Sequence, residues 1–148
     1  MAENVHEDDN LLGFLAENAV KAEDVTYVAS PRFLGKDRKP LGWRLRVLTS
    51  EECDDIMKRC KKKEFVPGTR DAKIVTDQDK FSTDLVCASV VYPNLDSEKL
   101  QGSYDAIGAA DLIHKMLTPG EYADLAYTVQ QANGFEVGMK DKIKRAKN

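Results

Sequence analysis

The order of apolar and polar residues predicts a short amphipathic helix near the start of the chain. Asn10 can act as its N-cap, because an asparagine side chain accepts a hydrogen bond from the backbone N–H groups of the first turn. The apolar side of this helix consists of Leu11, Leu12, Phe14, Leu15 and Ala19. We expect it to pack on its own domain or, as an equal alternative, in a groove of a partner or a neighbouring subunit.

An alternation of period two, which is typical of β-strands, comes next. Residues 25–29 and 32–34 are rich in β-formers, and in residues 43–47 apolar side chains alternate with two arginines. The turn-forming residues 35–40 lie between these segments. We predict a β-hairpin with one buried face, which helices must cover because an isolated hairpin is only marginally stable in water.

Capping sequences and apolar stripes predict the helices that follow. Thr49 and Glu52 form a capping box that starts a helix, and the basic run of Lys61 to Lys63 suits the C-terminal end of that helix. Its apolar stripe consists of Cys53, Ile56, Met57 and Cys60. Residues 64–75 interrupt the pattern, and we predict a mobile loop that can contain a short hairpin.

Further helices are predicted after this loop. Thr76 opens the first of them, whose apolar stripe extends to Tyr92 and which Pro93 ends. Residues 104–117 form another helix, with apolar positions on adjoining faces. The last spans residues 118–134, with a capping box at its start and an Asn-Gly pair that fits a left-handed stop at its end.

These elements define the α+β class, and we predict a mainly helical single domain with an N-terminal β-hairpin covered by about four to five helices. The length of 148 residues agrees with one domain. We place this domain at residues 10–137, between an acidic disordered leader at residues 1–9 and a basic flexible tail at residues 138–148.

The charges are distributed unevenly, although the formal net charge is only −3. Residues 1–24 contain seven acids and one lysine, which give −6, and residues 136–148 contain five bases and two acids, which give +3. Opposite charges at the two ends favour partner contacts and head-to-tail self-association. The residues that we predict to bind partners are Leu11, Leu12, Phe14, Leu15, Lys140, Lys142, Lys144 and Arg145.

Neither an export signal nor an apolar membrane span is recognisable in the sequence. Cys53, Cys60 and Cys87 form no CxxC pair and fall on apolar helix faces, so we predict reduced thiols buried in the core. We therefore expect a cytoplasmic protein that makes no membrane contact.

The sequence contains none of the motifs for phosphate binding, for a nucleophile elbow or for a zinc protease. His6 and His114 are too far apart to support a metal site or a catalytic pair, and we expect His114 to be a partly exposed side chain beside Asp111. We predict no enzyme activity and no cofactor. The basic run Lys58 to Lys63 could neutralise several phosphates, but acids precede it on the same helix, which favours a solvated helix end.

Two long stretches of the sequence resemble a known family. They are SPRFLGKDRKPLGWRLRVLTSEE at residues 30–52 and ASVVYPNLDSEKLQGSYDAIGAADLIHKMLTPGEYADLAYTVQQANGF at residues 88–135. Both closely resemble the XkdN-like phage tail assembly chaperones, and the resemblance covers roughly residues 11–137. Its distinctive parts are RFL followed by KPLGWRLR, then VVYPNLDSEKLQ, then MLTPGEYADL.

This resemblance implies a small protein encoded by a contractile-tailed phage or a prophage. Members of the family bind the long, helical, aggregation-prone tape measure protein before the tail tube polymerises around it, and they are not retained in the finished tail. The family brings no catalytic or cofactor residues, so the implied partner is the tape measure protein in the cytoplasm of a bacterial host cell. A small nucleic-acid-binding regulator and a structural tail protein are the alternatives.

Overall fold

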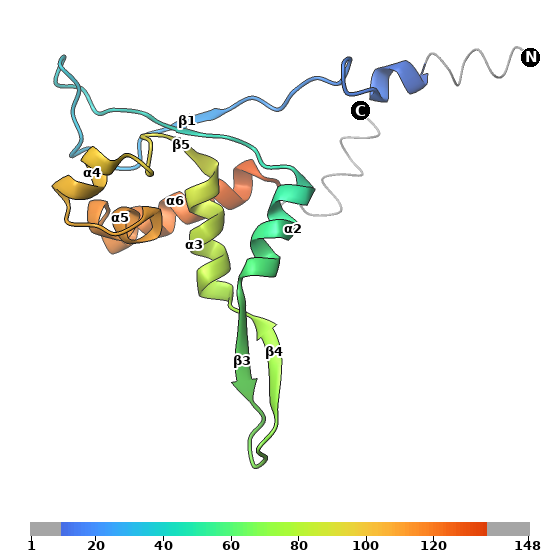
Figure 1. Ribbon diagram of the computed structural model, residues 1–148. Coiled ribbons are helices and arrows are strands. Elements are labelled where there is room, and N and C mark those ends of the chain that lie inside the picture. Colours follow the sequence, from blue (N-terminus) through green and yellow to red (C-terminus); the bar gives the residue numbers. More distant parts are fainter. Residues whose placement is uncertain (1–9, 136–148) are drawn as a thin grey trace, which may run out of the picture.

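A three-stranded antiparallel sheet stands at one end of the molecule, and the helices extend from it (Figure 1). The computed structural model describes residues 10–135, so the predicted leader at residues 1–9 and tail at residues 138–148 lie outside the described residues. The strands follow the order β1-β2-β5, with β1 at Val25–Tyr27, β2 at Trp43–Leu45 and β5 at Val90–Tyr92.

The predicted N-terminal hairpin is confirmed. Strands β1 and β2 pair antiparallel, with Val25 opposite Leu45. Trp43 and Leu45 are buried, whereas Arg44 between them is exposed, which is the alternation that the sequence predicts. The buried face of the hairpin therefore points toward the helices and supplies part of the core.

The third strand, β5, corrects the helix prediction for this segment. The helix expected to reach Tyr92 ends at Ser89, and the chain continues as a strand along β2. Val90 and Val91 are β-branched and favour an extended backbone when a strand edge is available for pairing. The apolar stripe of the predicted helix contains no information about β2, whose free edge is available for pairing with residues 90–92.

The helices of the body are α2 (Ser50–Arg59), α3 (Gln78–Ser89), α4 (Glu98–Ser103), α5 (Ala109–Met116) and α6 (Pro119–Ala132). The capping boxes predicted at Thr49 and Thr118 are both present. Helix α3 contacts α2, α5 and α6, so it occupies the centre of the α+β fold. The most buried large side chains include Trp43, Leu45, Leu112, Ile113, Leu125 and Val129.

Two helix starts differ from the prediction. Helix α5 begins at Ala109 instead of residue 104, because Asp105 and Gly108 have φ angles of 52° and 90°. Residues in left-handed conformations cannot continue a right-handed helix. Helix α3 is capped by Asp77 instead of Thr76, because Thr76 is the last residue of a strand.

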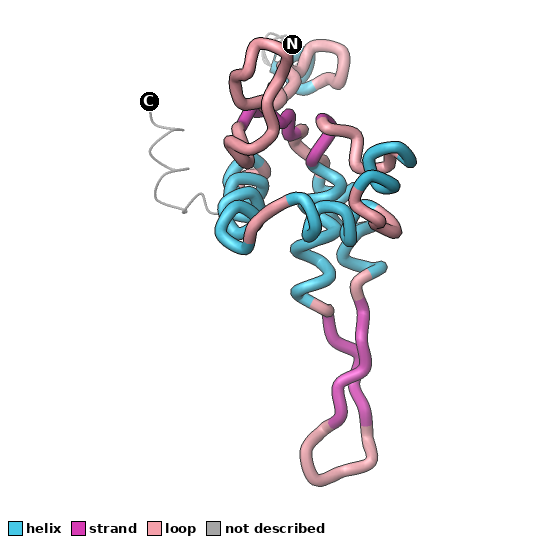
Figure 2. Tube along the Cα trace, turned by 90° about the vertical axis from the view of Figure 1, so that its left-hand side faces the viewer, coloured by secondary structure: helices cyan, strands magenta, loops and turns pink. Residues whose placement is uncertain are grey.

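A second β-hairpin projects from the end of the helices that lies away from the sheet (Figure 2). Strands β3 (Lys61–Phe65) and β4 (Ala72–Thr76) pair antiparallel along their whole length. The prediction that Lys61 to Lys63 support a helix end is therefore wrong, and the short hairpin allowed for residues 64–75 is confirmed. We refer to residues 61–76 as the distal hairpin.

The N-terminal arm, which we define as residues 10–24, extends from the start of β1 away from the helices (Figure 1). Its helical segment covers residues 10–14 and stops before Ala19. The chain turns there, because the side chain of Asn18 donates a hydrogen bond to the carbonyl of Leu12 at 2.8 Å. Every residue of the arm is exposed.

Candidate binding surfaces

The N-terminal arm is the first candidate surface. Its predicted partner-binding side chains are 56% (Leu11), 52% (Leu12), 82% (Phe14) and 36% (Leu15) exposed. They lie close together in sequence and outside the core cluster. Neighbouring exposed apolar side chains are typical of an interaction site, and their role as one stays a prediction. The four predicted basic contacts lie outside the described residues, at Lys140, Lys142, Lys144 and Arg145.

The distal hairpin is a second candidate surface, which the sequence analysis missed. Phe65 is 72% exposed and Ile74 is 71% exposed. Side chains alternate between the two faces of a strand, so Phe65 and Lys63 share a face, and Ile74 lies opposite Lys63 on the same face. The available signal was the Pro-Gly pair at residues 67–68 between two β-prone segments.

The structure divides the basic run that suggested nucleic-acid binding. Lys58 and Arg59 end α2, whereas Lys61 to Lys63 belong to β3 and alternate between the two faces of the distal hairpin. The ammonium group of Lys61 donates a hydrogen bond to Thr76 Oγ1 at 3.1 Å. The run therefore does not form the solvated helix end that the sequence predicted, nor one continuous basic face.

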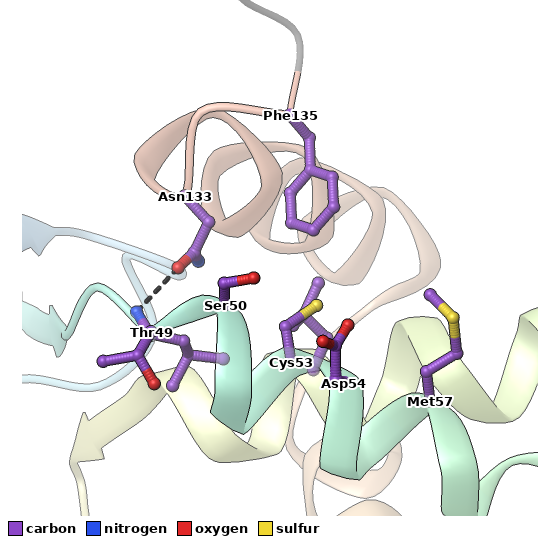
Figure 3. A pocket seen from close by; sticks show the side chains of 9 residues that line it. Thr49, Ser50, Cys53, Asp54, Met57, Asn133 and Phe135 are labelled. Carbon is purple, nitrogen blue, oxygen red and sulfur yellow. Dashed lines mark hydrogen bonds between the residues drawn. The ribbon is translucent and has the colours of Figure 1, made fainter.

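A groove of about 350 Å³ lies between α2 and the C-terminal end of α6 (Figure 3). Its apolar lining consists of Leu48, Cys53, Met57, Leu85 and Phe135. Thr49, Ser50, Asp54 and Asn133 add polar groups. This volume falls at the lower end of ligand pockets, which span roughly 300–1,000 Å³, so the groove can admit apolar side chains of a partner.

Asn133 forms one wall of the groove and joins three elements. Its Oδ1 accepts a hydrogen bond from the N–H of Leu48 at 2.7 Å (Figure 3). Its Nδ2 donates to the carbonyl of Val129 at 2.8 Å and to the hydroxyl of Ser89 at 3.4 Å. One side chain thus fixes the end of α6 against the start of α2 and the end of α3. The left-handed stop predicted at Gly134 is confirmed by its φ of 78°.

Glu52 connects the start of α2 to the sheet. Arg46, which follows β2, donates a hydrogen bond from Nη2 to Glu52 Oε2 at 2.6 Å. The N–H of Thr49 donates to the other carboxylate oxygen at 3.1 Å. These two hydrogen bonds, that of Arg46 first, lower the pKa of Glu52 to about 2.

Glu121 makes the corresponding connection at the start of α6. Hydrogen bonds from Ser30, from the N–H of Thr118 and from Arg32 lower its pKa to about 2. Arg32 also donates to the carbonyl of Met116 at 2.6 Å. Arg32 and Arg46 therefore anchor the N-terminal third of the chain to the starts of α6 and α2. Both ion pairs require the carboxylates of Glu121 and Glu52 to be ionised.

The prediction of cysteines buried in the core is confirmed for Cys60 and is only partly met by Cys53 and Cys87. Cys60 is fully buried, and Cys53 and Cys87 are half-buried against the core. Burial raises the pKa of all three thiols, that of Cys87 to about 11. Because the thiolate is the reactive form, a raised pKa lowers the reactivity of these thiols, and all three side chains pack in or against the core.

His114 lies in a shallow cavity with Asp79, Ser82, Thr83 and Tyr122. Its exposed ring packs on the ring of Tyr122, with 4.4 Å between centroids. The hydroxyls of Thr83 and Tyr122 are hydrogen-bonded at 2.9 Å. Within residues 10–135 no hydrogen bond joins His114 to either of these hydroxyls.

Metal-binding clusters and membrane-spanning helices are both absent from the described part of the chain. Residues 10–135 contain no group of three or more histidine, cysteine or acidic side chains placed to hold a metal ion. Over the same residues, no helix combines the length and the apolar character that a membrane crossing needs.

Comparisons with known proteins identify the family to which this chain belongs. The model of the phage XkdN-like tail assembly chaperone protein family matches residues 11–147, so the chain belongs to this family. The resemblance noted in the sequence is thereby confirmed.

Individual relatives come from Bacillus subtilis (strain 168). The chain is 27% identical over 147 residues to the phage-like element PBSX protein XkdN, covering 99% of this chain and 97% of XkdN. It is 26% identical to YqbN, an uncharacterised protein, with 91% of each chain covered. A crystal structure of YqbN has the same fold, with a TM-score of 0.70 and 22% identity over 84% of this chain and 95% of YqbN.

Proposed function

We propose that this chain binds the tape measure protein of a phage or prophage during tail assembly and is absent from the mature tail. The observation that supports this most directly is membership of the tail assembly chaperone family over residues 11–147. In this proposal the protein acts in the cytoplasm of the host cell, by binding alone and without catalysis.

The N-terminal arm is the proposed contact for the client. The resemblance implies a long, helical, aggregation-prone client, which in this proposal exposes apolar side chains until the tail tube polymerises around it. An amphipathic helix of this kind binds apolar side chains spaced along a partner helix or groove. Leu11, Leu12, Phe14 and Leu15 offer such side chains without any loss of core packing.

The charged ends extend the same proposal beyond the described residues. We propose that residues 10–137 form the folded domain, and that the acidic leader and the basic tail steer the client by charge. The basic contacts in this proposal are Lys140, Lys142, Lys144 and Arg145.

Coexpression with the tape measure protein of the same phage tests the function. The full chain is expected to keep the client in the supernatant, and a chain that lacks residues 1–22 is expected to lose most of this effect. A matched pair refines the test: Leu11→Ser with Phe14→Ser removes the apolar contacts, whereas Ile107→Ser changes an exposed apolar side chain elsewhere. Equal client solubility with all of these chains would contradict the proposal.

Two further measurements separate the alternatives. Mass spectrometry of purified phage particles is expected to find no peptide of this chain, whereas a structural tail protein would be present. Binding of DNA or RNA with a steep dependence on salt would instead favour the nucleic-acid regulator.

A further inference from the structure

The distal hairpin has no structural partner within the described chain. All of β3 is exposed, and so are the first three residues of β4, from Ala72 to Ile74. A two-stranded hairpin is at best marginally stable in water without a surface to pack on. The face that carries Phe65 and Ile74 therefore exposes apolar area that a partner would cover.

This face combines apolar and basic groups in a defined order. Phe65 and Ala72 form the outermost pair, Lys63 and Ile74 the next pair on the same face, and Lys61 and Thr76 lie at the base. Such a surface fits a short segment that carries large apolar side chains and negative charge.

We propose that the distal hairpin of one copy binds the N-terminal arm of a second copy of this chain. The arm supplies Leu11, Leu12 and Phe14, which are more than half exposed. The chain up to the end of the arm, residues 1–24, carries a net charge of −6. Residues 61–76 carry five bases and two acids, a net charge of +3. The signs of the two segments are complementary.

The same charges disfavour a different occupant, the hairpin of a second copy. Pairing two distal hairpins would bring two segments of charge +3 together. Like charges at an interface raise its free energy, so the acidic arm is the better match for the exposed face.

The length of the chain favours binding between copies over binding within one copy. Helix α3 has 12 residues and separates the sheet from the base of the hairpin, and β4 adds 5 residues. These elements span together about 35 Å. Nine residues lie between Leu15 and Val25 at the start of β1, and a flexible linker of that length has a typical end-to-end distance of about 17 Å.

An arm that binds the hairpin of a neighbour gives a head-to-tail arrangement. Such an interface uses two different surfaces, so it extends into open chains and does not close at a dimer. The contact between one helical turn and one hairpin is small, which makes the association weak and reversible.

Sedimentation of the full chain at increasing concentration tests this proposal. We expect the average mass to rise with concentration at low salt and to fall back toward the monomer at about 0.5 M salt, where charges are screened beyond about 4 Å. Two variants break the interface from opposite sides: Leu11→Ser with Phe14→Ser in the arm, and Phe65→Ser with Ile74→Ser in the hairpin. All four side chains are exposed, so the fold should persist.

Mixing the two variants distinguishes a head-to-tail interface from other modes of association. Each variant alone is expected to remain monomeric, whereas an equal mixture is expected to form dimers and nothing larger, because it contains one intact arm and one intact hairpin. Ile107 is 90% exposed and belongs to neither the arm nor the distal hairpin. The variant Ile107→Ser should therefore associate like the unaltered chain.

Specific results would overturn the proposal. A mixture that stays monomeric, or a hairpin variant that associates like the unaltered chain, excludes the pairing of arm and hairpin. An unaltered chain that is monomeric at every concentration also excludes this pairing. If the hairpin variant then fails to bind the client, the exposed face of the hairpin is a client contact instead. Because the sedimentation experiments contain no client, they can fail without affecting the proposed function.

Discussion

The body and the two projecting segments use similar apolar residues in opposite ways. In the body, Trp43 and Leu45 are 2% and 0% exposed, because the helices cover one face of the sheet. In the projecting segments, Phe14 and Phe65 are 82% and 72% exposed, because neither packs on the core cluster of the described residues. Figure 2 shows the distal hairpin projecting beyond the helices. The burial of an apolar residue is thus decided by the presence of an opposing layer and not by residue type.

This difference indicates a division of roles within the chain. The body has capped helices and one core cluster, so we expect it to supply most of the free energy of folding. The arm and the distal hairpin contribute little to that core and leave their apolar area available for partners. Changes in the body should therefore affect stability, and changes in the projecting segments should affect binding.

The largest predicted effect on stability is that of replacing Asn133 by alanine. This change removes the acceptor for the N–H of Leu48 and the donor to the carbonyl of Val129. The carbonyl of Val129 still accepts the backbone N–H of Asn133, so the N–H of Leu48 is the backbone group that loses its partner. A buried backbone group left without a partner costs about 1–3 kcal/mol, and because Leu48 is half-buried we expect a loss at the lower end of that range. Denaturant unfolding should show a lower midpoint with an unchanged slope.

Gln131→Ala is the matched control for this variant. Gln131 lies on the same helix, is exposed and donates a hydrogen bond only to the hydroxyl of Tyr127 within the described chain. Its replacement should change the unfolding free energy by no more than about 0.5 kcal/mol. Equal effects of both substitutions would show that Asn133 does not join the elements of the body.

Acid should weaken the body through Glu52 and Glu121. The pKa of each carboxyl is about 2 in the folded chain, against an ordinary value of 4.5 for a glutamate outside the fold. As the pH falls, these carboxyls therefore bind protons in the unfolded chain before they do so in the folded chain. The stabilisation is complete above about pH 4.5 and is lost progressively as the pH falls toward 2. Both ion pairs are partly exposed to solvent, so this effect should be smaller than that of Asn133→Ala.

The double variant Glu52→Gln with Glu121→Gln provides the control for the acid effect. Glutamine can still accept the N–H groups of the capping box but does not titrate. Thermal unfolding between pH 2 and pH 5 should therefore depend less on pH in the double variant than in the unaltered chain. An identical pH dependence would place the acid sensitivity at other groups.

The sequence predicted the elements that depend on local signals and missed those that depend on distant segments, for a physical reason. Thr118 and Glu121 form a local signal, because a capping box acts within one turn, and the alternation around Arg44 needs only one buried face. Strand β5 was missed because its pairing depends on the edge of β2, a segment more than forty residues earlier. A local pattern does not contain that information.

The candidate surfaces show the same limit. The exposed stripe of the arm was predictable from the spacing of Leu11 and Phe14, although its helix is shorter than predicted. The groove between α2 and α6 was not predictable, because Asn133 and Met57 lie far apart in sequence and come together only in the fold. Phe65 and Ile74 were missed because residues 61–63 were interpreted as a helix end.

Shortening of the distal hairpin should have the smallest effect on stability and is the most direct test of the division of roles. Lys61 lies opposite Thr76, so an Asn-Gly pair can replace residues 62–75 and close a two-residue turn between them. The hydrogen bond from the N–H of Asp77 to the carbonyl of Cys60 at 2.7 Å keeps the base of the hairpin closed. The unfolding free energy should change by no more than about 0.5 kcal/mol, because the removed residues bury no side chain of the core. A loss as large as that caused by Asn133→Ala would show that the hairpin belongs to the folding unit, and the distinction between a stable body and surfaces reserved for partners would then apply to the arm alone.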